Sequence, residues 1–394
     1  MGNEVPFLAF SGAKKKPENS WFFYPSSFSI NFLFMFDTVV FDMLLRVFYR
    51  IKSIVGYKEI ISSFFKRRRK MRYLGFIFIM SVLYFGLVSE GKAQPSQEEK
   101  KPEKIELAIR MDDLGYCHGV NMALKKILEQ GVCTSVSVIV NTPWVDEAAE
   151  ILRDHPEVSV GIHLVLNSEW KEFRWGPVVP YTEVPSLVDG FGRFYGSRRE
   201  LMAHEPKVAE VEKELRAQIE KGLRKGLKIS YCDYHMGAAL NCLEFQEVVE
   251  KLALEYHIGI SRYFGEEDTE KVYSTPPEEK TKEGIKIVEA LEPGRHVFVV
   301  HPGMDIPEMS AMTDLNVFGL KKMSVHRQAV TDMLCDPGFK QAIQKKGIEL
   351  INYNHLRDQG LHLMERPFTA KPWKEIVQKA QMGDSLAGTV GGKY

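Results

Sequence analysis

The sequence predicts an α/β protein with a parallel, (β/α) barrel-like fold of the distorted TIM-barrel type, in a single domain over residues 105–370. Apolar strand-like runs alternate with helix-like segments, about seven such strands fall in one stretch, and polar residues stand where strands end. Repeating βα units imply a parallel sheet between helices. With so many strands in one domain, a closed or nearly closed barrel competes with an open sheet.

The individual elements follow from local pattern. Strands are predicted at residues 105–110, 135–140, 158–163, 228–233, 258–262, 297–301 and 348–351, where the runs are short, apolar and rich in β-branched residues. Helices are predicted at residues 121–130, 144–154, 206–226, 243–256, 325–335 and 339–346, where apolar residues recur at helical spacing. Residues 168–199 and 265–283 are predicted to be irregular.

The region before the first strand has the order of a secretory signal. Residues 66–72 are basic, residues 73–88 are almost wholly apolar, and Gly91 and Ala93 match the small residues of a cleavage site. We therefore expect a signal peptide over residues 71–93 and an exported protein, periplasmic or extracellular. An uncleaved anchor is the alternative, although the apolar run is short for a membrane span.

The flanking segments complete the predicted organisation. A signal peptide stands at the start of a chain, so we hypothesise that translation begins at Met71 and that residues 1–70 are not translated. Residues 94–104 are polar and contain proline, which is typical of a linker. Residues 371–394 end in a glycine-rich stretch and are predicted to form a flexible tail.

Composition excludes some classes of protein. The chain has 52 basic and 52 acidic residues, so its formal net charge is +0. Nucleic-acid binding favours a basic excess, and we expect no such partner. We expect no membrane partner beyond the signal peptide. The five cysteines form no CxxC pair, which argues against a zinc finger or a redox motif.

Polar residues end several predicted strands. These residues are Asp112 and Asp113 after the first strand, His163 after the third, Asp233 and His235 after the fourth, and His301 after a later one. In a barrel these strand ends share one rim, so the residues converge. Two imidazoles and one carboxylate form a three-ligand metal site, which we predict to be Asp113, His163 and His235. The alternatives are a capped helix N-terminus for the Asp pair and an ordinary polar role for each histidine.

Several motifs carry a resemblance to a known family. They are MDDLGYCHGVN at residues 111–121, VNTP at 140–143, GIHLVLNSEW at 161–170, CDYHMG at 232–237 and VVHPG at 299–303, with a further match at 327–332 and 347–351. Together they resemble the YdjC-like carbohydrate deacetylase family, which includes chitooligosaccharide deacetylases. The resemblance covers about residues 105–355. It implies a barrel-like fold, a divalent metal bound by one Asp and two His, and removal of acetyl groups from N-acetylated sugars.

The sequence departs from the family pattern in two places. Many relatives carry further histidines where this chain has Met236 and Gly237, so His235 is the ligand candidate at that strand end. Some relatives have an acidic residue shortly before the HPG motif, where this chain reads Gly294-Arg295-His296-Val297. The second departure bears on the range of substrates more than on the chemistry.

The resemblance and the residue types together predict a metal-dependent hydrolysis of an amide in a single catalytic domain. Asp112 is the expected general base and His301 the expected acid, because the ordinary pKa of histidine suits a proton donor near neutral pH. Asp233 is expected to orient a metal-bound histidine. The roles of Asp112 and Asp113 are interchangeable on sequence grounds. The ligand set favours Zn²⁺, and the resemblance also allows Mg²⁺.

Further residues are candidates for substrate contact. The aromatic loop that includes Trp170 and Trp175 is expected either to form the wall of a sugar site or to pack on itself as a lid. Asn121 and Asn141 lie in the matching motifs and are expected near the site. Two other functions compete: hydrolysis of another acylated substrate, and carbohydrate binding without catalysis. The joint presence of Asp112 and His301 favours catalysis.

Overall fold

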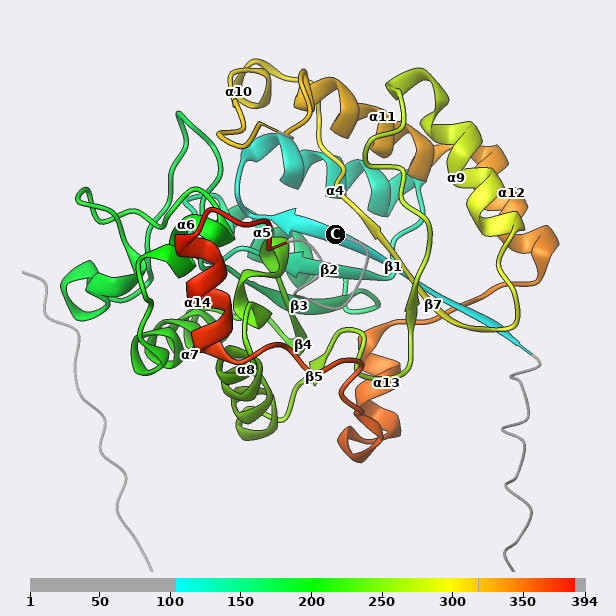
Figure 1. Cartoon of the computed structure of the whole chain (residues 1–394). Helices are drawn as coiled ribbons and strands as arrows, with labels where there is room; N and C mark the ends of the chain where they lie inside the picture. Colours follow the sequence, from blue (N-terminus) through cyan, green and yellow to red (C-terminus); the bar gives the residue numbers. More distant parts are fainter. Residues whose placement is uncertain (1–103, 318, 387–394) are drawn as a thin grey trace, which may run out of the picture. The chain divides into compact units, whose positions relative to one another are not determined.

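The computed structural model describes residues 104–317 and 319–386 (Figure 1). The expected upstream segment, the expected signal peptide and all but the last residue of the expected linker lie outside this part of the chain. No helix within the described ranges is long and apolar enough to cross a membrane.

A curled parallel sheet forms the centre of the described unit. Its strand order is β5-β4-β3-β2-β1-β7-β6, and β8 pairs with β1 off this path. The strands are β1 (Ile105–Leu114), β2 (Ser135–Val138), β3 (Ser159–Leu164), β4 (Ile229–Tyr234), β5 (Gly259–Ile260), β6 (Glu267–Asp268), β7 (Gly294–Val300) and β8 (Glu349–Leu350). Each paired ladder between them is parallel. The predicted parallel, barrel-like fold is therefore confirmed.

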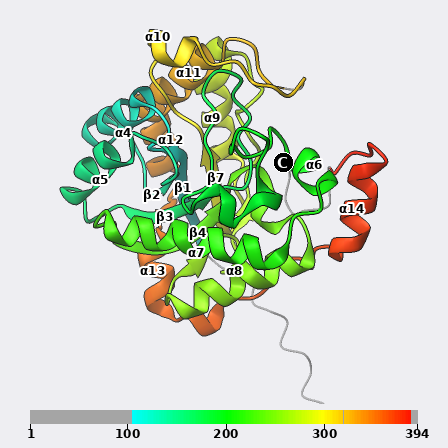
Figure 2. The ribbon, with the colours of Figure 1, turned by 90° about the vertical axis from the view of Figure 1, so that its left-hand side faces the viewer.

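Helices surround this sheet. They are α4 (His118–Gln130), α5 (Val145–Arg153), α6 (Arg198–Ala203), α7 (Val208–Arg224), α8 (Leu243–Glu255), α9 (Lys280–Glu289), α10 (Pro307–Ser310), α11 (Met323–Cys335), α12 (Pro337–Lys346), α13 (Tyr353–Gln359) and α14 (Trp373–Gln381). Short 3₁₀ helices are η1 (Tyr181–Glu183), η2 (Pro185–Leu187), η3 (His235–Leu240), η4 (Pro277–Glu279) and η5 (Leu361–Leu363). Helices α4, α11, α9 and α12 lie together beside β1 and β7, whereas α7 and α8 run side by side next to β3 and β4 (Figures 1 and 2).

Side chains along β1 point alternately to the core beneath the helices and to the interior of the curled sheet. Leu107 and Ile109 join the large apolar cluster between the sheet and the helices. Ala108 belongs instead to a second cluster inside the sheet. Successive side chains of a strand point to opposite faces, so Arg110 and Asp112 continue the inward row above Ala108. The inward face of β1 thus changes from apolar to charged towards its carboxyl end.

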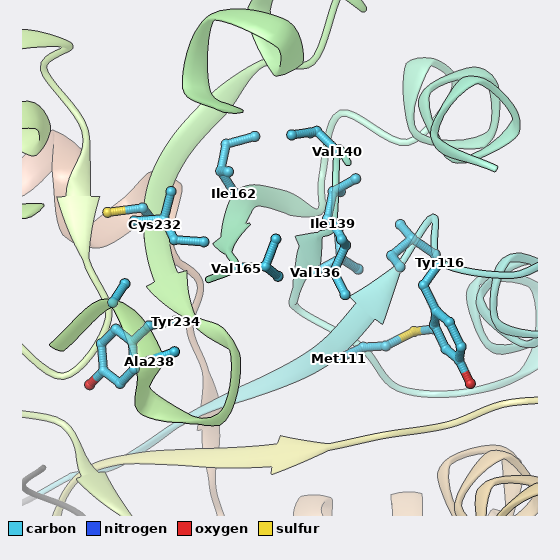
Figure 3. Close-up of a cluster of buried hydrophobic side chains, with 14 of the residues drawn as sticks. Met111, Tyr116, Val136, Ile139, Val140, Ile162, Val165, Cys232, Tyr234 and Ala238 are labelled. Carbon is cyan, nitrogen blue, oxygen red and sulfur yellow. The ribbon is translucent and has the colours of Figure 1, made fainter. Parts of the chain in front are cut away.

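The large apolar cluster fixes strands β1 to β4 relative to one another. Figure 3 shows part of it, with Met111 from β1, Val136 from β2, Ile162 from β3 and Cys232 from β4. All four side chains are at most 1% exposed. Removing one such side chain costs about 2–5 kcal/mol in typical cores. The strand ends that carry the polar residues are therefore held by a well-packed layer behind them.

Gly161 allows a large side chain to fill the interior beneath His163. A Cβ at this position would lie 2.4 Å from the ring of Tyr231, its neighbour on β4. That ring stacks on Tyr353 at a centroid distance of 4.0 Å, and its hydroxyl donates to the Val136 carbonyl at 2.8 Å. The motif Gly-Ile-His thus pairs a glycine that admits Tyr231 with a histidine on the same face of β3.

Helix α12 illustrates how local sequence sets the ends of an element. Asp336 caps its N-terminus, because its side chain accepts from the N–H groups of Gly338 and Phe339. Pro337 occupies the first helical position, where the missing N–H costs nothing. Gly347 ends the helix with a φ of 71°, in the left-handed region that glycine tolerates. The predicted helix at residues 339–346 is therefore present and begins two residues earlier.

The structure differs from the predicted tail. Helix α14 lies within residues 371–394, and its Ile376 is fully buried. Trp373 anchors the start of the helix by donating its indole N–H to the Pro206 carbonyl at 3.0 Å. The apolar side of α14 packs against α6 (Figure 2). Its short amphipathic repeat was too weak a signal beside the glycine-rich end. Residues 387–394 lie outside the described ranges.

The segment predicted as a loop at residues 265–283 is also more ordered than expected. It contains β6, η4 and the first turn of α9. Helix α9 buries Ile287 and Val288, with charged residues on its exposed side. A high content of Glu and Lys concealed this helix in the sequence, since few apolar positions mark its buried face.

Candidate metal centre and active site

The three residues predicted to bind a metal converge at the carboxyl ends of β1, β3 and β4. The Asp113 Oδ1 atom lies 3.5 Å from His163 Nε2 and 3.3 Å from His235 Nδ1. The two ring nitrogens are 3.2 Å apart. All three residues are at least 95% buried. One oxygen and two nitrogens from distant parts of the chain therefore face a single point.

Each of these three side chains is held from behind through its other polar atom. His163 Nδ1 lies 2.9 Å from Asp233 Oδ1, and His235 Nε2 lies 2.9 Å from Glu169 Oε2. Arg327 donates from Nη2 to Asp113 Oδ2 at 2.6 Å. Such outer partners fix the tautomer and the orientation of metal ligands. The arrangement leaves His163 Nε2, His235 Nδ1 and Asp113 Oδ1 directed inward.

An irregularity in β1 brings both aspartates into the site. Neighbouring strand residues normally point to opposite faces of a sheet. Here the register of β1 with β2 shifts between Met111 and Leu114, and Asp113 has a φ of 70°. A bulge with a left-handed residue redirects a side chain. Asp112 and Asp113 consequently both have a carboxylate oxygen within 4.8 Å of a His163 ring nitrogen.

Arg110 links two carboxylates beneath the three converging atoms. Its Nε and Nη2 atoms donate to the two oxygens of Asp112 at 2.7 and 2.8 Å. Its Nη2 atom also lies 3.0 Å from Asp233 Oδ2, and its Nη1 atom bonds to the Ser261 hydroxyl at 2.5 Å. Burial raises the pKa of Asp112, but Arg110, His163 and His301 together outweigh burial and lower that pKa to about 2. Asp112 is therefore ionised and rigidly held.

A second group of possible ligands consists of Asp112, His163 and Asp233. Arg110 occupies both Asp112 oxygens, and Asp233 already contacts the Nδ1 atom of His163. The Asp113 Oδ1 atom, by contrast, is buried and makes no hydrogen bond of normal geometry within the described residues, with the two histidine nitrogens at 3.3 and 3.5 Å as its polar neighbours. A buried acceptor without a partner calls for an ion or a water. The contacts thus favour Asp113 over Asp112 as the carboxylate ligand.

The two histidines of the centre are more basic than usual. Burial lowers the pKa of His235, but Glu169 and Asp113 outweigh burial and raise that pKa to about 10. Burial also opposes the charged form of His163, and Asp233 and Asp112 raise its pKa above the ordinary value. Both rings lie among carboxylates, which stabilise a positive charge. A bound cation would supply that charge in place of the protons.

His301 follows β7 and has different surroundings. Its side chain is partly buried, and its ring packs at 74° to the ring of Tyr273, with the centroids 5.8 Å apart. Burial lowers the pKa of His301 to about 4, although Asp113 and Asp112 act in the opposite direction. Burial thus moves the pKa of His301 below the range that its residue type alone suggests, which favours a neutral ring before the reaction.

The two predicted tryptophans lie in the site but are buried. Trp170 stacks on Tyr116 with the centroids 6.0 Å apart, and Trp175 packs edge-on against His235 at 5.9 Å. Trp170 also bridges to Asp314 in an isolated antiparallel pair. This contact agrees with the alternative in which the loop packs on the molecule itself. Neither indole offers an open face in this conformation.

The two predicted asparagines hold the backbone around the site. Asn121 accepts from the Gly115 N–H at 2.9 Å and donates to the Trp144 carbonyl at 2.9 Å. Asn141 donates to the Gly176 carbonyl at 3.0 Å and to Glu214 Oε1 at 3.0 Å. Glu214 in turn accepts from the backbone of the loop after Gly176. The observed contacts of both asparagines are thus with the protein, and they fix the loops after β1 and before η1.

Three site residues were not predicted from the sequence. Glu169 lies on the loop after β3, Arg327 lies on α11, and Arg110 lies inside β1. Glu169 and Arg327 fall within the matched motifs, which was the only signal for them. Arg110 interrupts an apolar run, and a buried arginine is rare unless it is paired. That interruption was a usable sign of a buried carboxylate nearby.

The fold and the site define a class of protein: a curled parallel α/β barrel in which one aspartate and two histidines converge at the strand ends. The chain belongs to the YdjC-like protein family, whose sequence model matches residues 106–345. This range lies within the domain predicted at residues 105–370 and includes every residue of the cluster described above.

Named relatives are similar over much of the chain. A carbohydrate deacetylase of Brevibacillus brevis is 32% identical over 265 residues, which are 64% of this chain and all of that protein. A carbohydrate deacetylase of Geobacillus stearothermophilus is 34% identical over 39% of this chain and 57% of that protein. A crystal structure from Enterococcus faecalis, named as a candidate cellobiose-phosphate cleavage protein, superposes with a TM-score of 0.55. It is 23% identical and covers 64% of this chain and 99% of its own. That last similarity supports the fold.

Proposed function

We propose that the chain is a metal-dependent carbohydrate deacetylase that removes N-acetyl groups from amino sugars or short chitin-type oligosaccharides. The observation that carries this proposal is the convergence of Asp113 Oδ1, His163 Nε2 and His235 Nδ1 within 3.5 Å of one another. The names of the relatives support a carbohydrate substrate with an acetyl group. A three-residue ligand set leaves positions open for water and substrate.

The charges of the cluster fit a divalent cation. Four carboxylates and two guanidinium groups are buried together, those of Asp112, Asp113, Glu169, Asp233, Arg110 and Arg327. The cluster therefore lacks two positive charges, and burying uncompensated charge is costly. A divalent ion would restore neutrality while leaving both histidines neutral, as ligation requires. The nitrogen-rich donor set favours Zn²⁺, and Mg²⁺ stays a second candidate.

The proposed reaction breaks the amide C–N bond and transfers the acetyl group to water. The metal would act as a Lewis acid that acidifies water and polarises the acetyl carbonyl. Asp112 would accept the proton of that water, because it is ionised and held beside the cluster by Arg110. Asp233 and Glu169 would keep the two rings in the orientation in which one nitrogen of each faces the ion.

His301 would pass a proton to the departing sugar nitrogen. Its ring is neutral at rest, because burial lowers its pKa to about 4. It must therefore gain a proton within the cycle before it donates one. The proton taken up by Asp112 is the source that we propose, since Asp112 and His301 directly follow the paired residues Met111 and Val300 on neighbouring strands. One proton of the water would thus end on the leaving amine. The second, on the new carboxyl group, would pass to the amine or to solvent, so that acetate leaves as the anion.

The test is acetate release from N-acetylglucosamine oligomers by the full chain, first stripped of metal and then reloaded with Zn²⁺ or Mg²⁺. Asp112→Asn and His163→Ala should abolish metal-dependent release. His155→Ala is the matched control, since His155 pairs with Glu157 away from the cluster. Tight metal binding without release would favour another acylated substrate. Absence of both would favour a carbohydrate-binding protein.

We also propose that the protein is exported, on the basis of the basic, apolar and small-residue order of residues 66–93. Expression of the gene from its full reading frame, followed by cell fractionation and N-terminal peptide mapping, tests this. Mature protein in the periplasm or medium that begins near Gln94 would support it. Intact cytoplasmic chains that retain peptides upstream of Met71 would contradict both export and the proposed start.

A further inference from the structure

Tyr273 lies between the solvent and the candidate active site. Its side chain is 38% exposed, whereas the three candidate ligands are at least 95% buried. Its ring packs against His301 at a centroid distance of 5.8 Å and an angle of 74°. Tyr273 is therefore an accessible ring beside the proposed proton donor.

The loop that carries Tyr273 is fastened at two points. At its start, the Thr269 N–H donates to the Val297 carbonyl on β7 at 3.1 Å. Near its tip, the Lys280 ammonium group donates to the carbonyls of Val272 and, at 2.9 Å, of Tyr273 itself. The first contact ties the loop to β7, which precedes His301, and the second ties it to the first residue of α9. The position of the Tyr273 ring is thus determined by more than its own packing.

Lys280 is an unusual residue for holding a loop in place. It is only 1% exposed, and no ion pair joins it to a carboxylate in the described part of the chain. Burial lowers its pKa to about 8, which reflects the cost of removing an ammonium group from water. Hydrogen bonds to two backbone carbonyls offset only part of that cost. A buried cation dedicated to a loop indicates that the loop conformation matters.

We propose that Tyr273 contacts the sugar ring whose nitrogen leaves at His301, and that Lys280 is the positioning residue that holds Tyr273 in place. This proposal rests on the proposed function. A group that protonates the sugar nitrogen must lie next to the ring that bears it, and Tyr273 is an exposed aromatic side chain in contact with His301. Aromatic faces pack well against the apolar face of a sugar and add directional contact.

The experiment measures steady-state acetate release by the full chain with N-acetylglucosamine oligomers. Tyr273→Ala should raise KM about tenfold and change kcat less than threefold, because it removes a binding contact and no proton donor. Tyr273→Phe should stay within about twofold of the unmodified chain, since the ring is retained. Lys280→Met should raise KM about threefold to fivefold, because the ring stays but its position loosens.

Two measurements separate positioning from a general loss of structure. Lys286→Met is the matched control on the same helix, since Lys286 is exposed and pairs with Glu283 on the helix surface. Metal content and circular dichroism should be unchanged in every variant. In the double variant Tyr273→Ala/Lys280→Met, KM should equal that of Tyr273→Ala alone, because Lys280 would act through the ring.

The proposal is overturned if Tyr273→Ala leaves KM within twofold of the unmodified chain, or if it reduces kcat instead. Additive effects in the double variant would remove Lys280 from the proposal. Should Lys280→Met fail to fold, the exposed position of Tyr273 keeps the first test decisive. If the unmodified chain releases no acetate, the proposed function and this proposal are overturned together. If the unmodified chain is active and Tyr273→Ala leaves KM unchanged, this proposal alone is overturned.

Discussion

Two histidines of the same site have opposite acid–base character. His235 lies between Glu169 and Asp113, and its pKa is raised to about 10. His301 has no carboxylate within hydrogen-bonding distance among the described residues, and burial lowers its pKa to about 4. Both rings follow strands of one sheet. Their position in the fold therefore does not determine their chemistry.

The difference shows which interaction determines the pKa of a buried histidine in this site. Burial disfavours the imidazolium at both residues, so burial alone cannot separate them. A carboxylate in direct contact reverses the sign for His235, and a more distant pair of carboxylates does not do so for His301. A metal ligand benefits from fixed orientation and strong basicity. A residue that receives and passes a proton benefits from being neutral at rest.

The largest expected effect separates the two histidines by metal affinity. His235→Gln should lower metal affinity more than about 100-fold, because one of three ligands is lost. His301→Gln should bind metal within about threefold of the unmodified chain but release acetate about 100-fold to 1,000-fold more slowly. Metal titration against a chromophoric chelator, beside the acetate assay, measures both. Loss of metal from His301→Gln would contradict the distinction between a ligand, His235, and a proton donor, His301.

A smaller effect is expected at the carboxylate that distinguishes His235. Glu169→Gln should lower metal affinity about 10-fold to 100-fold, because the partner of the ring N–H loses its charge. Glu172→Gln is the control, since Glu172 is exposed and its Oε1 atom pairs with Lys171 Nζ at 3.6 Å. The same chelator titration applies. Equal affinities for the two variants would show that Glu169 does not support the ligand.

The raised pKa of His235 predicts a pH dependence of the metal-free protein. A group whose pKa is higher in the folded state stabilises the fold fully below its unfolded pKa. For His235 this contribution is present below about pH 6.5 and is lost as pH rises through about 10. Urea unfolding of the metal-free chain should show stability falling across this window relative to His235→Gln. If the stabilities of the two proteins changed in parallel across this pH window, the raised pKa assigned to His235 would be contradicted.

The smallest expected effect concerns the ring beside His235. Trp175→Leu should weaken metal binding by about threefold, because an edge-on aromatic contact contributes about 0.5–1.5 kcal/mol. The same substitution should leave Tyr273, which lies beside His301, unaffected, so KM should not change. A larger effect on KM than on metal affinity would place Trp175 in the sugar site. Trp175 would then act with His301 and not with the metal ligand His235.

The sequence predicted the convergence of Asp113, His163 and His235 because parallel strands place their carboxyl ends at one rim. That argument needs only the order of strands and the residues that end them. Glu169 and Arg327 could not be derived this way, since one lies on an irregular loop and the other on a helix remote in sequence. Their contacts depend on how loops and helices pack, which residue spacing does not encode.

The same limit applies to the helices and to proton affinity. Helix α14 was predicted as a flexible tail, although Ile376 buries it against the domain. The pKa of His301 was assigned from its residue type, whereas its depth and the distance to carboxylates determine it. Strand patterns are strong because they are long and apolar, while short amphipathic helices and desolvation are properties of the assembled structure.

The central place of β1 has a consequence for synthesis on the ribosome. Strand β1 pairs early with β2, but its ladders with β7 (residues 294–300) and β8 (residues 349–350) need parts of the chain that are translated much later. An unpaired apolar strand edge is prone to associate with other chains. Nascent chains that lack β7 should therefore depend on chaperones, and a premature stop before that strand should yield an aggregating fragment instead of a weakened enzyme.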